Sequence, residues 1–170
     1  SDCSSSGGPI HYYYGQSEVV VSGQQLDSSL RTTNWGRVVV FDSSNVTISG
    51  NTISHVWGIP GDPGSETPGG TMAPPTTGLY LHGITTGVVE ENAILDVAGG
   101  PSGGHCLGYA PGVVGGEANG IVVSGCTGML VQNNSVDVVT GGSGGAPEYN
   151  DVGGQGGMGA GIRIIASNGC

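Results

Sequence analysis

The sequence predicts an all-β solenoid built from stacked parallel coils, and three observations support this prediction. A pattern of alternating apolar residues, a polar pair, an amide and one more apolar residue occurs four times, as EVVVSGQQL, NVTISGNTI, GVVEENAIL and GMLVQNNSV. This pattern is typical of a strand, a tight bend and a second strand. The four repeats recur at spacings of 27, 41 and 42 residues, and the 36 glycines cluster between them. A fixed period of this length indicates a solenoid.

Each coil begins with a strand that we align on the residue preceding it. These residues are Ile10, Arg37, Gly78, Gly120 and Gly161. The first strands then read HYYY, VVVF, LYLH, IVVS and IRII, with apolar first and third positions in nearly every coil. Successive side chains of a strand point to opposite faces, so these positions are predicted to face inward. Residues 1–9 are expected to form an N-terminal segment, and residues 10–170 a single domain.

A second strand, an amide and a further apolar position complete each coil. The second strand contributes inward pairs such as Val19 and Val21, and the amide is followed two places later by Leu26 or its equivalent. The amides share one register, and we expect their side chains to stack and hydrogen-bond along the solenoid axis, because the backbone bonds of a bend are incomplete. They are Gln24, Asn51, Asn92 and Asn134.

The segments GIVVSGCTGMLVQNNSV and NVTISGNTI resemble the parallel β-helix repeats of the pectate-lyase-like and NosD-like superfamily. The resemblance covers about two thirds of the chain. It implies a right-handed parallel β-helix of about four and a half coils, each with three short parallel strands and an Asn ladder at one bend. The right hand follows from the family and from the general preference of parallel crossovers.

Three Gly/Pro-rich inserts of nearly equal length lie between the coils, at residues 57–77, 98–119 and 140–160. None of them has helical or strand periodicity. One interpretation is flexible loops on one side of the solenoid. The alternative is a second layer of extended segments lying side by side, because glycine and proline allow polyproline II backbones to approach closely.

Charge and composition limit the partners and the compartment. The net charge is −10, which argues against nucleic acid and anionic membranes as partners, and no run is apolar enough to insert into a bilayer. The opening SDCSSSGGP is typical of a processed, mature start. Four cysteines, an absence of lysine and a surface rich in Ser, Thr and Gly favour an extracellular or cell-surface location.

The positions of the cysteines along the coils suggest how they pair. Cys126 lies at the first bend of the fourth coil and Cys106 in the insert before it, so an internal Cys106–Cys126 disulfide is favoured. Cys3 and Cys170 lie about four coil rises apart, too far for a bond within one chain but close between stacked subunits. Cys170 also aligns with the inward row, where it would be a buried thiol. Other connectivities stay open.

The candidate chemical groups do not assemble into a catalytic site. Hydrolysis of a glycosidic bond needs two carboxyls at a fixed separation, and the neighbours Glu90 and Glu91 should point to opposite sides. His55 and Asp96 share a register in adjacent coils, where they can form an exposed pair. We therefore assign no catalytic residue, no metal site and no cofactor. Calcium bound between coils is an alternative, through carboxylates that lie in the inserts: Asp62, Glu66, Glu117, Glu148 and Asp151.

Two sequons, beginning at Asn45 and Asn133, fall at bends where a glycan would point outward. The aromatic residues, among them Tyr12, Tyr80 and Trp57, offer surfaces for sugar stacking, although in the alternative interpretation HYYY covers the open N-terminal end.

These observations predict an extracellular structural protein, a subunit of a filament or surface assembly. The fifth coil is incomplete, and neither end carries a cap, so copies are expected to stack head to tail. The residues assigned to that contact are Ile10, Tyr12, Tyr13, Ile162 and Ile164. The alternatives are a carbohydrate-active β-helix fragment, either a polysaccharide lyase or a glycoside hydrolase, and a non-catalytic glycan-binding module.

Overall fold

A computed structural model of the chain describes residues 11–27, 31–32, 36–62, 70–103, 113–145 and 154–170. The residues in these ranges form β-strands and no helix. In chain order the strands are β1 (His11–Tyr14), β2 (Val19–Ser22), β3 (Gln25–Asp27), β4 (Arg31–Thr32), β5 (Val38–Phe41), β6 (Val46–Ser49), β7 (Thr52–Gly58), β8 (Thr76–His82), β9 (Gly87–Glu90), β10 (Ala93–Ala98), β11 (Ala118–Ser124), β12 (Met129–Gln132), β13 (Ser135–Thr140) and β14 (Gly159–Ile165).

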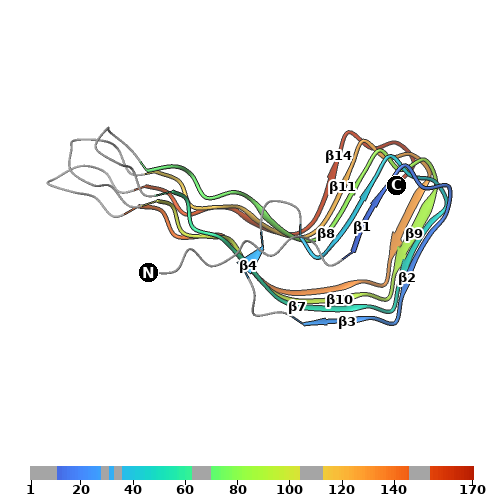
Figure 1. Cartoon of the computed structure of the whole chain (residues 1–170), viewed down its shortest axis with the longest axis horizontal. Coiled ribbons are helices and arrows are strands. Elements are labelled where there is room, and N and C mark those ends of the chain that lie inside the picture. The colour runs from blue at the N-terminus through green and yellow to red at the C-terminus, as the bar shows by residue number, and fades with distance from the viewer. Residues whose placement is uncertain (1–10, 28–30, 33–35, 63–69, 104–112, 146–153) are drawn as a thin grey trace, which may run out of the picture.

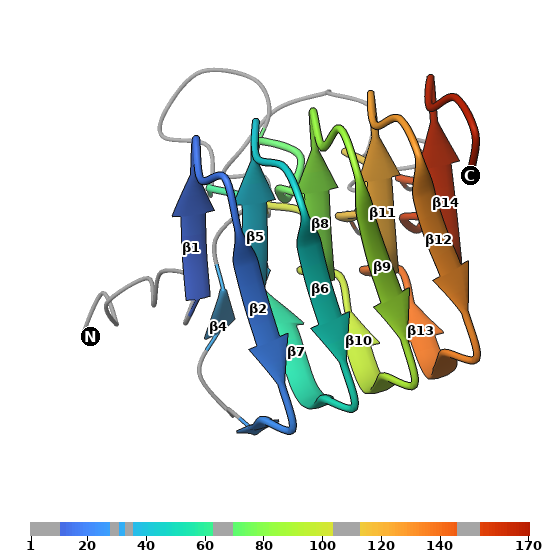
Figure 2. The same cartoon turned by 90° about the vertical axis from the view of Figure 1, so that its right-hand side faces the viewer.

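The strands form three parallel sheets that the chain visits in turn (Figures 1 and 2). The first sheet has the order β1-β5-β8-β11-β14. The second has the order β12-β9-β6-β2, and the third β13-β10-β7-β3, with β4 also paired to β7. Each strand pairs with its equivalent one coil away, and every pairing is parallel. The predicted parallel β-helix is therefore confirmed.

The core is the stack of inward rows that the alternation predicted. The first sheet contributes Val38, Leu79 and Ile121 in one row, all fully buried. The equivalent rows of the second and third sheets close the interior from the other two sides. Burying these aliphatic side chains contributes roughly 1.5–3 kcal/mol each, which makes the interior the main source of stability.

The third sheet departs from simple alternation at one position in each coil. His55, Asp96 and Val138 adopt positive φ values of 54°, 54° and 52° at the same register of β7, β10 and β13. This left-handed residue bends all three strands at the same register and resets the alternation. The next inward residue therefore follows after three positions rather than two, as from Ile53 to Val56. The strand continues beyond this bend and carries a second inward row, Val56, Val97 and Val139.

The predicted amide ladder occupies the bend between the second and third sheets. Asn92 Oδ1 accepts bonds from the backbone N and the Nδ2 of Asn51, at 3.1 and 2.9 Å. Asn134 Oδ1 receives the same two bonds from Asn92. Gln24 differs, because its exposed side chain bonds to Ser22 O of its own coil and only its backbone N reaches Asn51 Oδ1. The ladder is thus made by the three asparagines, with Gln24 joining through its backbone.

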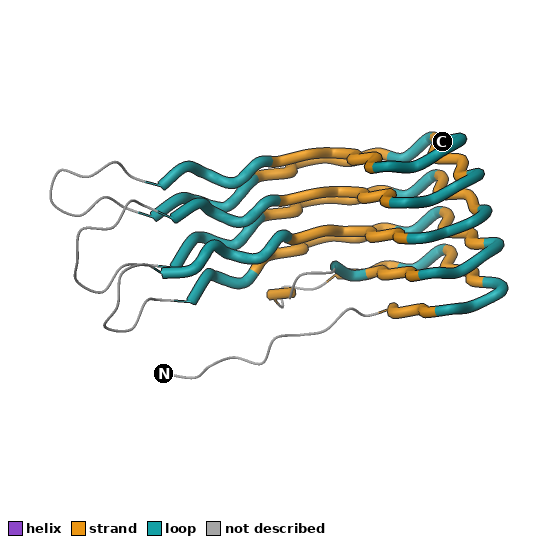
Figure 3. Tube along the Cα trace, turned by 90° about the horizontal axis from the view of Figure 1, so that it is seen from above, coloured by secondary structure: helices purple, strands orange, loops and turns teal. Residues whose placement is uncertain are grey.

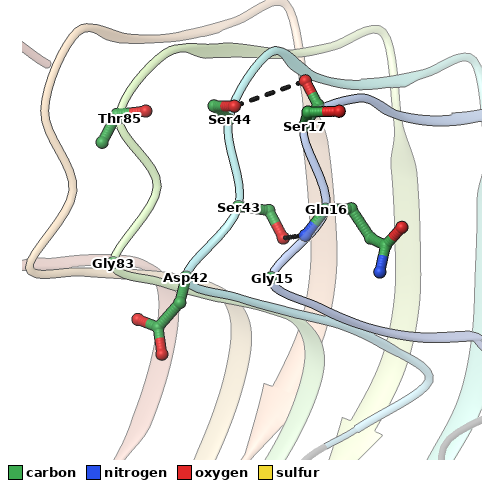
Figure 4. A pocket seen from close by; sticks show the side chains of 8 residues that line it. All are labelled: Gly15, Gln16, Ser17, Asp42, Ser43, Ser44, Gly83 and Thr85. Atoms are coloured by element: carbon green, nitrogen blue, oxygen red, sulfur yellow. Dashed lines mark hydrogen bonds between the residues drawn. The ribbon is translucent and has the colours of Figure 1, made fainter.

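A second ladder, which we did not predict, lies at the bend between the first and second sheets. Ser43, Cys126 and Ser167 point a hydroxyl or thiol inward and bond to the carbonyl two residues earlier, at 2.8 to 3.3 Å. Each of these side chains also accepts a hydrogen bond from the backbone N–H of the equivalent residue in the preceding coil, as Ser43 does from Gln16 (Figure 4). Serine and cysteine are interchangeable here because both are small and can donate and accept.

This ladder explains why the prediction of a Cys106–Cys126 disulfide is wrong. Cys126 is a free, fully buried thiol whose Sγ accepts from Ile84 N and donates to Ser124 O. Burial raises the pKa of this thiol, which makes it inert. Cys170 is free and exposed rather than buried in the inward row. Cys3 and Cys106 lie outside the described residues.

The described parts of the inserts form an ordered second layer, which confirms the layered interpretation for these parts. Figure 1 shows the described parts extending from one side of the coils, and Figure 3 shows them stacked coil upon coil. Backbone bonds link the segments directly: Gly116 N donates to Gly100 O, Gly142 N to Gly116 O, and Gly157 N to Gly142 O. The backbones approach so closely that a Cβ on Gly142 would lie 1.8 Å from Gly100 O. We call this element the glycine-rich layer; its described segments are 59–62, 70–75, 99–103, 113–117, 141–145 and 154–158.

Candidate interaction surfaces

The edge strand β14 of the first sheet exposes inner-row residues whose equivalents in the interior strands β5, β8 and β11 are buried. Ile162 and Ile164 on β14 are 45% and 51% exposed, whereas Ile121 and Val123, one coil earlier, are fully buried. At the opposite edge, β1 exposes 55% of Tyr12, while Tyr13 is half-buried against the core. Ile10 lies outside the described residues. Four of the five residues assigned to the assembly contact therefore lie on these two outer strands.

A groove lies on the outer side of the first sheet, where β8, β11 and β14 meet the glycine-rich layer. Its volume is about 290 Å³. Tyr80 lies on one side, and an ion pair between Arg163 Nη1 and Glu117 Oε2, 2.6 Å apart, lies on the other. Burial raises the pKa of the Tyr80 phenol, so it stays a neutral hydrogen-bonding group. The lining residues are Pro75, Thr77, Tyr80, Glu117, Asn119, Val122, Arg163 and Ile165.

A more apolar hollow of about 330 Å³ lies over the glycine-rich layer. Pro75 and Glu117 line both the groove and this hollow, so the two are adjacent. Met72 and Met158 in the hollow are 60% and 63% exposed. Sequence reasoning missed this groove because it depends on the second layer being ordered. The placement of Glu117 within an insert and of Arg163 on a strand gives no sequence signal that they meet.

Another polar recess, of about 390 Å³, lies at the bend between the first and second sheets (Figure 4). It is lined by serines, glycines, Gln16, Thr85 and one carboxylate, Asp42. In Figure 4 the Asp42 side chain points away from Ser44 and Thr85. One carboxylate directed away from the other side chains gives this recess no means of acid–base chemistry or metal binding.

Exposed charged and aromatic residues form a network across three coils of the third sheet. His55 Nδ1 bonds to Asp27 Oδ1 at 2.6 Å, and Trp57 Nε1 donates to Asp96 Oδ2 at 3.0 Å. The His55 and Trp57 rings meet edge to face, 5.8 Å between centroids. His55 and Asp96 therefore do not bond to each other as expected. His55 bonds to Asp27, and Asp96 accepts a bond from Trp57. His55 and Asp96 both have positive φ at this register, and the Trp57 indole provides the partner for Asp96.

We predict that His55 titrates at a higher pH than an ordinary histidine. Its hydrogen bond to Asp27 raises the pKa of His55, and the same bond lowers the pKa of Asp27. The stabilisation by a raised histidine pKa is complete below the unfolded pKa and is lost as pH rises through the folded pKa. The Asp27 contribution is present above its unfolded pKa and is lost as pH falls through its folded pKa. The pair is therefore strongest from weakly acidic pH up to the unfolded histidine pKa of roughly 6.5.

An NMR titration of the His55 ring protons checks this prediction. Asp27→Asn should return the midpoint toward the ordinary histidine value, whereas Asp96→Asn should change it less, because Asp96 acts only through a weaker charge interaction. Equal shifts in the two variants would contradict the assignment.

The remaining predicted groups lie apart from one another. Among the described residues, no group of three or more His, Cys, Asp or Glu side chains is arranged to hold a metal ion. Glu117 is paired with Arg163, and Glu66, Glu148 and Asp151 lie outside the described residues. Asn45 and Asn133 are both exposed, so both sequons are accessible. No helix among the described residues is long and apolar enough to cross a membrane.

Comparison with known proteins gives one result at the level of the family. The model of a family described as a right handed beta helix region matches residues 1–169, nearly the whole chain. No curated protein and no solved structure matches the chain.

Proposed function

The chain belongs to the right-handed β-helix family, and we propose that it is an extracellular structural protein whose copies join end to end into a filament or surface assembly. The observation that carries the proposal is the exposure of Ile162 and Ile164, whose row is fully buried in the adjacent coil. An exposed parallel strand edge with an apolar inner row is a template for another strand. A contact between unlike ends that does not close on itself produces a fibre.

The charge distribution supports association at these edges. The chain carries a net charge of −10, yet β1, β2, β12 and β14 contain no Asp or Glu. Carboxylates on outer strands occur in the third sheet, at Asp27 and Asp137. Electrostatic repulsion between copies is therefore weakest at the first sheet and arises mainly at the third. Salt should strengthen assembly, because it screens this repulsion.

An extracellular location accounts for the cysteines. Cys170 is exposed and free, so it is available to bond with Cys3 of a second copy. Such a bond persists in an oxidising compartment. Cys170→Ser should then leave assembly intact in reductant and weaken it under oxidising conditions.

Placing charge on the inner row of β14 should abolish assembly. In the double variant Ile162→Glu, Ile164→Glu, any strand added to β14 would bury two carboxylates without partners, which is strongly unfavourable. We expect the native chain to form fibres in negative-stain microscopy and fast-sedimenting species in the ultracentrifuge, and the variant to sediment as a monomer. Leu95→Glu, on the outward face of the interior strand β10, is the matched control and should assemble normally. A native chain that stays monomeric at high concentration and high salt would overturn the proposal.

The groove beside the glycine-rich layer supports a second candidate function, binding of glycans without catalysis. An aromatic ring, an Arg–Glu pair and the neighbouring amide and hydroxyl of Asn119 and Thr77 line one open depression. Sugar rings stack on aromatic faces, and their hydroxyls bond to charged and amide groups. The hollow beside the groove shares Pro75 and Glu117 with it, so the two together would suit a chain of sugars rather than a single one.

Tyr80→Ala should weaken glycan binding about tenfold if the phenol ring stacks on a sugar. Isothermal titration calorimetry with a panel of neutral and carboxylate-bearing oligosaccharides measures this. Tyr14→Ala is the control, because Tyr14 lies on the outer side of the same sheet, is 60% exposed and does not line the groove. Equal affinity in both variants would remove the groove as the binding site.

A further inference from the structure

We propose that Glu117 makes the groove selective for uncharged sugars, because it neutralises the cation that would otherwise attract acidic ones. This inference rests on glycan binding, the second candidate function, and names its ligand class. Arg163 is the only arginine among the described residues that line the groove and the adjacent hollow, and the chain has no lysine. Glu117 lines both depressions and pairs with Arg163, so the side chains that line them carry no net charge.

The ion pair joins the glycine-rich layer to the first sheet. Glu117 is the last residue of a layer segment, directly before β11, and Arg163 lies on β14, opposite Val122 in the register. Arg163 Nη1 and Glu117 Oε2 are 2.6 Å apart, and the two side chains are 39% and 40% exposed. A ligand carboxylate would have to replace Glu117 at the guanidinium and would be repelled by it. A sugar hydroxyl can bond to either partner without separating them.

Two buried polar side chains beside the pair also favour an uncharged partner. Thr77 and Asn119 line the groove, are 3% and 4% exposed, and form no side-chain hydrogen bond within the described part of the chain. Buried polar groups are almost always hydrogen-bonded, so these two require a partner in the groove. Sugar hydroxyls both donate and accept, as the Thr77 hydroxyl and the Asn119 amide require, whereas an ionised carboxylate only accepts.

Glu117→Gln tests this selectivity, because it removes the negative charge and keeps a side chain of the same shape. Calorimetry compares oligomers of glucose, galactose and mannose with their uronic-acid forms of the same linkage. In Glu117→Gln, we expect the affinity for the acidic form of the bound sugar to rise about tenfold, and the affinity for the neutral form to change less than about twofold. The gain should shrink at high salt, which screens charge, and should disappear when Arg163→Gln is added.

Glu90→Gln is the matched control, because it changes the net charge equally at a carboxylate that bonds to Gln132 on the second sheet and does not line the groove. If the native chain binds sugars, an equal gain in Glu90→Gln, no gain in Glu117→Gln, or a native preference for acidic oligomers would overturn the selectivity and leave glycan binding standing. Absence of binding to every oligomer, in both the native chain and Glu117→Gln, would overturn both. A gain confined to Glu117→Gln, and lost with Arg163→Gln while neutral binding is retained, supports Glu117 as the residue that sets the ligand class.

Discussion

Asn92→Ala is expected to lower the free energy of unfolding by about 3–5 kcal/mol, which is a large fraction of the stability of an ordinary domain. Asn92 is 1% exposed and lies in the middle of the amide ladder. Its Oδ1 accepts two bonds from Asn51, and its Nδ2 donates to Ile48 O and Asn134 Oδ1, both at 2.9 Å. Alanine removes all four bonds and leaves their partners buried without replacements.

The position of Asn92 within the ladder provides the control. Asn134 is more exposed than Asn92, so water can replace some of the hydrogen bonds that its side chain makes. Asn134→Ala should therefore lower the free energy of unfolding by only about 1–2 kcal/mol. Asn92→Asp keeps the acceptor oxygen but loses both donated bonds and buries a charge, so it should be at least as damaging as alanine. Urea unfolding followed by circular dichroism measures all three. A smaller loss for Asn92→Ala than for Asn134→Ala would contradict the interior ladder as a source of stability.

The sequence was most informative where a single residue type repeats at a fixed register. The amides and the inward rows fall in this class, because every coil imposes the same local demand on the same position. The first-bend ladder is harder to see in the sequence, since its register holds Ser43, Cys126 and Ser167 but has the apolar Ile84 in the coil between Ser43 and Cys126. Recognising Cys126 as a substitute for serine would have shown it to be a core thiol rather than half of a disulfide.

Other features depend on contacts that no local pattern encodes. Val56, Val97 and Val139 pack in the core, yet the left-handed residue before each places it three positions after the previous inward residue, where strict alternation predicts an outward side chain. At the same register, His55 bonds to Asp27 instead of Asp96. The groove needs Glu117 from the second layer and Arg163 from β14, 46 residues apart. The pairing of Glu117 with Arg163 depends on how the glycine-rich layer packs against the first sheet. The periodicity of the sequence carries no information about that packing.

The second large effect is expected from Gly142→Ala, which should destabilise the protein by about 3 kcal/mol and separate the glycine-rich layer from its neighbours. Gly142 N donates to Gly116 O, and Gly142 O accepts from Gly157 N. An added Cβ would lie 1.8 Å from Gly100 O and 2.6 Å from its carbon. These contacts involve backbone, so no side chain can rotate away, and both bonds of Gly142 must break or lengthen.

Gly156→Ala is a closely matched control for this prediction, because it makes the same substitution in the same layer. Its Cβ would meet only Gly142 O, at an ordinary 3.5 Å, so its stability should change by no more than about 0.5 kcal/mol. Amide hydrogen exchange should show faster exchange at Gly142 and Gly157 in Gly142→Ala, with the strands of the second sheet unchanged. Since the bond from Gly142 N to Gly116 O joins one insert to the insert before it, a layer that separates locally would show that it stabilises the stack of coils without being required for the fold. Native exchange rates in Gly142→Ala would contradict the close packing on which the layer depends.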